Sequence, residues 1–80
     1  MTTQHDVQQL SPADISMRSI LLQVRKHHGL TDSEITITTG LSTAWVEQYR
    51  RELVLLDVLY DAGFYRDDEP VWRAARSRSA

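Results

Sequence analysis

The sequence predicts a mainly α-helical domain in which three helices are followed by a small β-hairpin. Three observations support this prediction: helix-capping signals recur along the chain, apolar residues repeat at helical spacing, and the last third contains two short apolar runs around a polar turn. Eighty residues suffice for one domain with a thin core. We therefore expect one folded unit over 11–73, a flexible N-terminus over 1–10 and a basic flexible tail over 74–80.

The first helix is expected over about 12–28. Ser11 is a favourable N-cap, and Pro12 and Asp14 follow it in the first turn, where proline and an acidic residue are preferred. Gly29 stands where a left-handed residue would end the helix. The apolar residues recur at spacings of three and four and form an inward stripe: Met17, Ile20, Leu21 and Val24.

The second helix is expected over about 32–39. Thr31 and Glu34 have the spacing of a capping box, in which each side chain accepts a hydrogen bond from the other residue's backbone amide. Leu30 and Ile35 have the spacing of a hydrophobic staple across the same cap. The β-branched run 35–39 also suits a strand. The capping box favours the helix, and the strand is the alternative.

The third helix is expected to begin after Ser42 and to run from about 43 to 62, before Gly63. A continuous seam supports it: Val46, Tyr49, Leu53, Leu56 and Tyr60. Trp45 is expected to pack in the core. The mostly apolar stretch 54–60 adds a second face, which is interpreted as a dimer seam of Leu55, Val58 and Leu59. Alternatively, part of this stretch is a strand that joins the sheet of the hairpin.

After Gly63 the pattern changes from helical to extended. The residues 64–66 and 71–73 are short apolar and aromatic runs that each end in arginine, and the polar residues 67–70 between them include Pro70. This arrangement is typical of a strand, a turn and a second strand. We therefore expect a short β-hairpin at the end of the domain.

The order of these elements resembles the winged helix-turn-helix domains of prokaryotic and phage regulators, over residues 14–74. The residues that carry the resemblance are Leu30, Glu34-Ile35, Gly40-Leu41-Ser42, Val46, Leu53, Ala62-Gly63-Phe64-Tyr65-Arg66 and Val71-Trp72-Arg73. The resemblance implies a three-helix core with a C-terminal wing. It also implies a sequence-specific DNA-binding transcriptional regulator that acts as a homodimer, and the small size suggests a phage or mobile-element origin.

In such a domain the third helix enters the major groove of double-stranded DNA. With the seam directed inward, the DNA-facing residues would be Thr43, Ala44, Glu47, Gln48 and Arg51. We expect Gln48 to read adenine, Arg51 to contact guanine or phosphate, and Glu47 to accept from cytosine. Thr43 and the N-termini of the second and third helices would bind phosphates. Arg66 and Arg73 on the hairpin, with Arg76 and Arg78 beyond it, would reach the flanking backbone.

The charge of the chain leaves a second interpretation open. The net charge is −2, and the tip of the expected hairpin is Asp67-Asp68-Glu69, which phosphate would repel. Many winged domains have basic residues at this tip. The alternative function is therefore a winged-helix protein–protein interaction module, which binds a protein partner through its acidic wing or its long apolar helix.

Composition argues against other classes of function. The chain has no cysteine, and its three histidines are not spaced as metal ligands, so we expect no metal site. No catalytic arrangement of nucleophile and base is visible, and so we expect neither enzymatic activity nor a cofactor. The sequence has no apolar run long enough to span a membrane and no secretion signal. We expect a cytoplasmic protein without a membrane partner.

Overall fold

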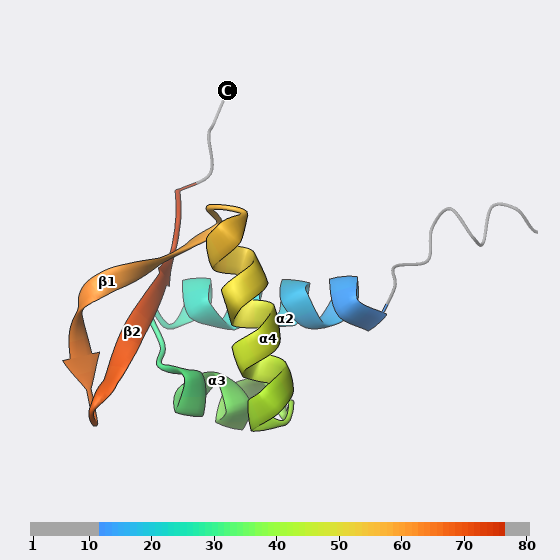
Figure 1. The fold of residues 1–80 in the computed structure, drawn as a ribbon, viewed down its shortest axis with the longest axis horizontal. Helices are drawn as coiled ribbons and strands as arrows, with labels where there is room; N and C mark the ends of the chain where they lie inside the picture. Colours follow the sequence, from blue (N-terminus) through green and yellow to red (C-terminus); the bar gives the residue numbers. More distant parts are fainter. Residues whose placement is uncertain (1–11, 77–80) are drawn as a thin grey trace, which may run out of the picture.

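The computed structural model describes residues 12–76, in which three helices precede a two-stranded antiparallel hairpin (Figure 1). The elements are α2 (Pro12–Lys26), α3 (Asp32–Thr39), α4 (Thr43–Leu55), β1 (Leu59–Arg66) and β2 (Glu69–Ala74). The order of helices and hairpin predicted from the sequence is therefore confirmed. The predicted flexible residues 1–10, the Ser11 cap and the end of the tail, including Arg78, lie outside the described residues.

The first helix is shorter than predicted at its C-terminal end. It stops at Lys26, and both His28 and Gly29 beyond it have positive φ, 59° and 124°. The amide of His28 donates to the carbonyl of Arg25, and that of Gly29 donates to Val24. Gly29 also allows close packing, because a Cβ atom there would lie 3.1 Å from Cγ1 of Val71.

The second helix has the predicted bounds, and the strand alternative for this segment is wrong. The capping box is present: the amide of Thr31 donates to the Glu34 carboxylate, and the amide of Glu34 donates to Thr31 Oγ1. Gly40 ends the helix in the left-handed conformation, with φ 78°. These local signals outweigh the β-branched composition, because they satisfy the amides that a helix of this length otherwise leaves unpaired.

The third helix begins as predicted, with Ser42 Oγ accepting the amide of Trp45, but the prediction that it continues to residue 62 is wrong. The helix ends at Leu55, two residues before Asp57, which has φ 62°. The amide of Val58 donates to Leu53 and that of Asp57 to Val54, which together form a Schellman motif. The alternative interpretation, a strand within 54–60 that joins the wing's sheet, is the observed one.

This change of element rearranges the predicted apolar seam. Val46, Tyr49 and Leu53 are buried as predicted, but Leu56 and Tyr60, which follow the helix, are exposed. Leu59 is only 1% exposed and belongs to the core, so its assignment to a dimer seam is wrong. The other two seam residues, Leu55 and Val58, are exposed and half-buried respectively.

The hairpin is longer than predicted and has a tighter turn. Arg66 pairs with Glu69, so that only Asp67 and Asp68 lie in the turn. Both aspartates have positive φ, 54° and 68°, as a type I′ turn requires. Pro70 therefore lies in β2 rather than in the predicted turn.

Gly63 was predicted to end the third helix and instead lies inside β1. The strand register shifts between Asp61 and Tyr65, which marks a β-bulge around this glycine. Gly63 has φ 90°, and its amide donates to Oδ1 of Asp61 at 2.8 Å. The glycine thus provides a conformation that other residues rarely adopt, within a strand rather than at a helix end.

Backbone hydrogen bonds attach the hairpin to the helical layer. Leu30, between α2 and α3, forms an antiparallel bridge with Trp72 of β2, with N···O distances of 3.0 and 2.8 Å. At the other end, the amide of Ala75 donates to the carbonyl of Val58. Residues 74 and 75, predicted to begin the flexible tail, therefore continue the sheet.

The core lies where the three helices and the hairpin meet. All five elements and the segment between α2 and α3 contribute buried apolar side chains: Ile20, Val24, Leu30, Ile35, Val46, Tyr49, Leu53, Leu59 and Val71. Trp45 is 55% exposed, so its predicted core position is wrong. Within residues 12–76, no helix is long and apolar enough to cross a membrane.

Candidate nucleic-acid interface

The outer face of α4 carries the five residues of this helix that were predicted to contact bases or phosphates. Thr43, Ala44, Glu47, Gln48 and Arg51 are exposed, whereas the opposite face of the same helix is buried. This separation follows from the helical period, which places the five side chains within about 140° of arc. We call this surface the α4 outer face.

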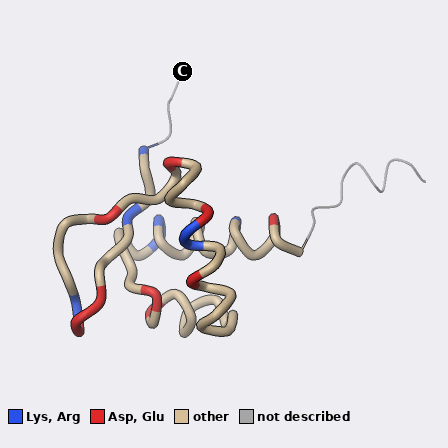
Figure 2. The backbone as a smooth tube through the Cα atoms, viewed as in Figure 1, with Lys and Arg blue, Asp and Glu red and all other residues tan. Residues whose placement is uncertain are grey.

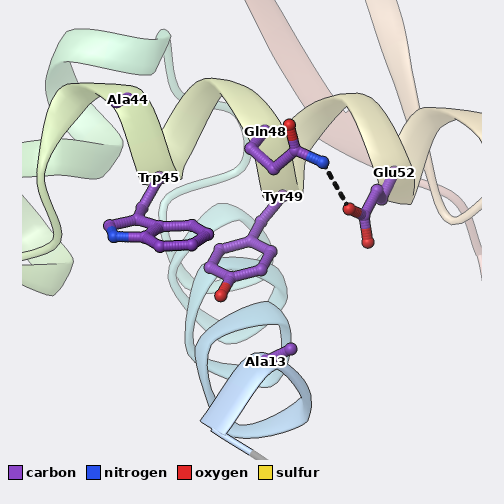
Figure 3. Close-up of a pocket in the computed structure, with 6 residues that line it drawn as sticks. All are labelled: Ala13, Ala44, Trp45, Gln48, Tyr49 and Glu52. Carbon is purple, nitrogen blue, oxygen red and sulfur yellow. Dashed lines mark hydrogen bonds between the residues drawn. The ribbon is translucent and has the colours of Figure 1, made fainter.

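The charges on the α4 outer face nearly balance. Arg51 has no ion-pair partner among residues 12–76, while Glu47 precedes it by one helical turn. Gln48 donates from Nε2 to Oε2 of Glu52 at 2.7 Å (Figure 3). Figure 2 accordingly shows acidic and basic positions alternating along this helix. The surface therefore offers hydrogen-bonding groups rather than a concentration of positive charge.

Arg50, next to Arg51 in the chain, points in a different direction and is not part of this face. Its guanidinium donates to both carboxylate oxygens of Asp32, at 3.0 and 2.7 Å, and lies 4.4 Å from the ring centroid of Trp72. The hydrogen bond to Asp32 raises the pKa of Arg50. Because both charged side chains are largely buried, Arg50 joins α3, α4 and β2 and is not available to a ligand.

Arg66 on the hairpin is also paired within the protein. It donates to both oxygens of Glu34, at 2.9 and 2.6 Å, and to the carbonyl of Gly29 at 3.2 Å. The hydrogen bond from Arg66 is the main cause that lowers the pKa of Glu34. Arg66 was predicted from the sequence to contact DNA. In this structure its ion pair with Glu34 joins the wing to α3.

One of the three carboxylates at the wing tip, that of Glu69, is bonded within the protein. It accepts hydrogen bonds from the backbone amide and the hydroxyl of Ser33, in the first turn of α3. A carboxylate at this end of a helix is favoured by the helix dipole. The amides of Ser33 and Glu34 are therefore already bonded within the protein, to Glu69 and Thr31 respectively, at the end of α3 that was predicted to bind phosphate.

The N-terminus of α4 is more open. Ser42 accepts the amide of Trp45 through its hydroxyl and that of Val46 through its carbonyl. The two preceding amides, of Thr43 and Ala44, are among those that no helix bonds internally, and both residues are exposed. Of the predicted phosphate contacts at helix N-termini, the structure leaves this one accessible.

Arg73, on β2, is the second predicted wing contact and remains exposed. It lies opposite Tyr60 in the hairpin and forms no ion pair with the described residues. Arg76, just beyond the strand, is exposed as well. The available positive charge of the wing therefore lies near its base rather than at its tip.

A groove of about 660 Å³, which the sequence did not predict, borders the α4 outer face. Trp45 and Tyr49 stack with ring centroids 5.2 Å apart, and both project from α4 toward Ala13 at the start of α2 (Figure 3). Ala44, Gln48 and Glu52 complete its walls. The available signal was the helical period, which places Trp45 about 100° from Val46 and therefore at the edge of the buried face.

Neither the known protein families, nor the characterised proteins, nor the solved structures contain a significant match to this chain. Within residues 12–76, His, Cys, Asp and Glu side chains do not gather in threes in a way that would hold a metal ion. Any function must therefore be argued from the surfaces described above.

Proposed function

We propose that this chain is a winged helix-turn-helix domain that binds double-stranded DNA and acts as a sequence-specific regulator. In this proposal α3 and α4 are the two helices of the motif, joined by the short turn 40–42, and β1 with β2 is the wing. The attachment of the hairpin through the Leu30–Trp72 bridge supports the assignment, because it joins β2 to the segment that leads into α3, the first helix of the motif.

The observation that carries the proposal is the exposure of the α4 outer face. A helix fits the major groove, and the first turns of a recognition helix contact the base edges there. Gln48 and Arg51 lie on these turns, exposed and side by side along the helix. In contrast with Arg50, Arg51 is not engaged in an ion pair within the described part of the chain.

Each residue of this face has a role that its chemistry supports. In the complex Gln48 gives up its hydrogen bond to Glu52, and its side-chain amide binds adenine instead. Arg51 binds guanine or a phosphate. Glu47 accepts from the amino group of cytosine. The amides of Thr43 and Ala44 bind a phosphate at the end of the helix. Arg73 and Arg76 contact the backbone beside the groove.

The ion pairs described above limit the affinity. Arg50 and Arg66 are neutralised internally, which leaves Arg51, Arg73 and Arg76 near the proposed interface. About three phosphate contacts per subunit correspond to a slope of about −3 in a plot of log affinity against log salt concentration. Binding is therefore expected to be strongest at low salt and to depend on base contacts for its specificity.

The test is selection of DNA from a random duplex pool at several salt concentrations, followed by a comparison of variants on the selected sequence. The double variant Gln48→Ala/Arg51→Ala is expected to lose about tenfold or more in affinity, because each paired base contact contributes about 1–3 kcal/mol. Lys26→Ala, which removes one positive charge at the exposed end of α2, is the control and keeps the affinity. No enrichment of any sequence at low salt would contradict the proposal.

A second candidate function, a protein-interaction module, is supported by the groove beside α4. Trp45 is half exposed there, and exposed aromatic side chains over an apolar groove are typical of protein-binding sites. The exposed carboxylates of Asp67 and Asp68 also fit a protein partner better than DNA. This candidate predicts no salt-dependent DNA binding, and a stable complex with a protein that Trp45→Ala abolishes in a pull-down.

A further inference from the structure

A second exposed surface is formed by α2 and the turn that follows α4. We call it the Leu22 face, made of Arg18, Leu21, Leu22, Arg25, Leu56 and Val58. Leu22 and Leu56 are 62% and 64% exposed, a high value for leucine. Between α2 and the turn lies a hollow of about 370 Å³. Asp14 and Arg18 line it together with the apolar side chains of Met17, Leu21, Leu53, Leu56 and Val58.

A protruding side chain and a hollow lie next to each other on this face. Leu21 and Arg18 line the hollow and also line a neighbouring depression of about 400 Å³ together with Leu22 and Arg25. Leu22 therefore stands at the edge of the space that Leu56 and Val58 enclose. When such a surface meets its own copy across a twofold axis, each protruding side chain can enter the hollow of the other copy.

The charges at the margins of the Leu22 face have the same self-complementary arrangement. Arg18 and Arg25 lie one turn before and one turn after Leu22 on α2, and both are exposed. Asp57, also exposed, lies between Leu56 and Val58 on the other margin. None of these three charges forms an ion pair within residues 12–76. A twofold rotation can bring Arg18 and Arg25 of one copy to Asp57 of the other.

We propose that the Leu22 face is a homodimer interface, occupied by a second copy of this chain. This interface replaces the dimer seam predicted from the sequence, because Leu59 of that seam is buried in the core. It does not depend on the proposed DNA binding. The 15 residues of α2 span only about 22 Å, so we expect an interface smaller than the roughly 800 Å² per partner that is typical of stable complexes. The dimer is therefore weak, with a dissociation constant in the micromolar range.

The first experiment measures the mass of the full chain in solution by light scattering, without DNA, from about 1 to about 500 µM. The expected result is a transition from monomer to dimer within this range. Leu22→Glu is expected to shift the midpoint at least about tenfold upward, because it places a charge in the apolar hollow of the other copy. Ile37→Glu is the matched control and leaves the midpoint unchanged, because Ile37 is 80% exposed and lies on α3, which contributes no residue to the Leu22 face.

The second experiment tests the arrangement of the two copies and does not require a destabilising variant. The chain has no cysteine, so Leu22→Cys and Leu56→Cys each introduce a single thiol. One of the two variants is labelled uniformly with ¹⁵N so that its mass differs from that of the other. A mixture of the two is expected to form the mixed disulfide faster than either forms one with Ile37→Cys. A monomer at all concentrations, a dimer that Leu22→Glu leaves intact, or equal cross-linking rates would each overturn the proposal.

Discussion

Two neighbouring arginines show how one position along a helix decides the role of a side chain. Arg50 is turned toward α3 and β2, where it bonds Asp32 and stacks on Trp72, whereas Arg51, about 100° further around α4, faces solvent. The sequence favoured Arg51 as the DNA contact because of this period. It did not reveal the partner of Arg50, since Asp32 is 18 residues away and only the packing of α3 on α4 brings the two together.

The same pair of residues gives a prediction for stability. Arg50→Ala is expected to lower the free energy of unfolding by about 2–4 kcal/mol, because it leaves the largely buried carboxylate of Asp32 without its partner. Arg51→Ala removes the same side chain from an exposed position and is expected to change it by no more than about 0.5 kcal/mol. Urea denaturation of the two variants measures both values. Equal losses would contradict the structural role of Arg50.

At the scale of elements, local signals were sufficient for some parts and not for others. The bounds of α3 follow from a capping box and a C-terminal glycine, both of which act within a few residues. The end of α4 depends on Asp57 in the left-handed conformation, for which aspartate is a less obvious signal than glycine. The mostly apolar residues 53–60 are compatible with either a helix or a strand. Pairing with β2, which lies further along the chain, makes the last of them part of a strand.

The turn of the hairpin shows that the acidic wing tip has a conformational cause. Asp67 and Asp68 occupy the two positions of a type I′ turn, where aspartate is tolerated and Asn-Gly is preferred. Glu69 holds the first turn of α3. The three carboxylates therefore support the fold of the wing, and they do not by themselves identify a positively charged partner.

This explanation predicts the effect of replacing the turn. Asp67→Asn/Asp68→Gly is expected to stabilise the hairpin by about 0.5–1 kcal/mol, measured as a higher thermal midpoint, because both new residues adopt positive φ more readily. The variant also removes two negative charges from the wing. If the wing lies beside DNA as proposed, affinity for the selected duplex rises at low salt, and the gain shrinks as salt increases. A gain in stability without a gain in affinity would place the wing tip away from DNA.

For the whole molecule, the sequence predicted which side of α4 is exposed but not which charges remain available on it. The net charge of −2 gave no information about pairing. The ion pairs that remove Arg50 and Arg66 from the surface connect residues 18 and 32 positions apart, and they exist only because the helices and the wing pack together. Similarly, the hollow beside Leu22 arises where α2 meets the turn after α4, which the sequence had placed inside a helix.

The two proposed surfaces are made of different residues. The base-reading residues lie on the N-terminal turns of α4, whereas the Leu22 face is formed by α2 and the turn that follows α4. They can therefore be disabled separately. Arg51→Ala is expected to weaken binding to a duplex with one half-site and to a duplex with two, because it removes a contact made by each subunit.

Leu22→Glu is expected to leave affinity for one half-site within about twofold of the original and to weaken binding to two half-sites by about tenfold or more. The reason is that dimerisation makes the second contact intramolecular and so raises its effective concentration. Titration of both duplexes with both variants, monitored by fluorescence anisotropy, measures the four affinities. If Leu22→Glu weakened the single half-site as strongly as the double one, the Leu22 face would belong to the DNA-binding surface, and the proposed separation of the two surfaces would be wrong.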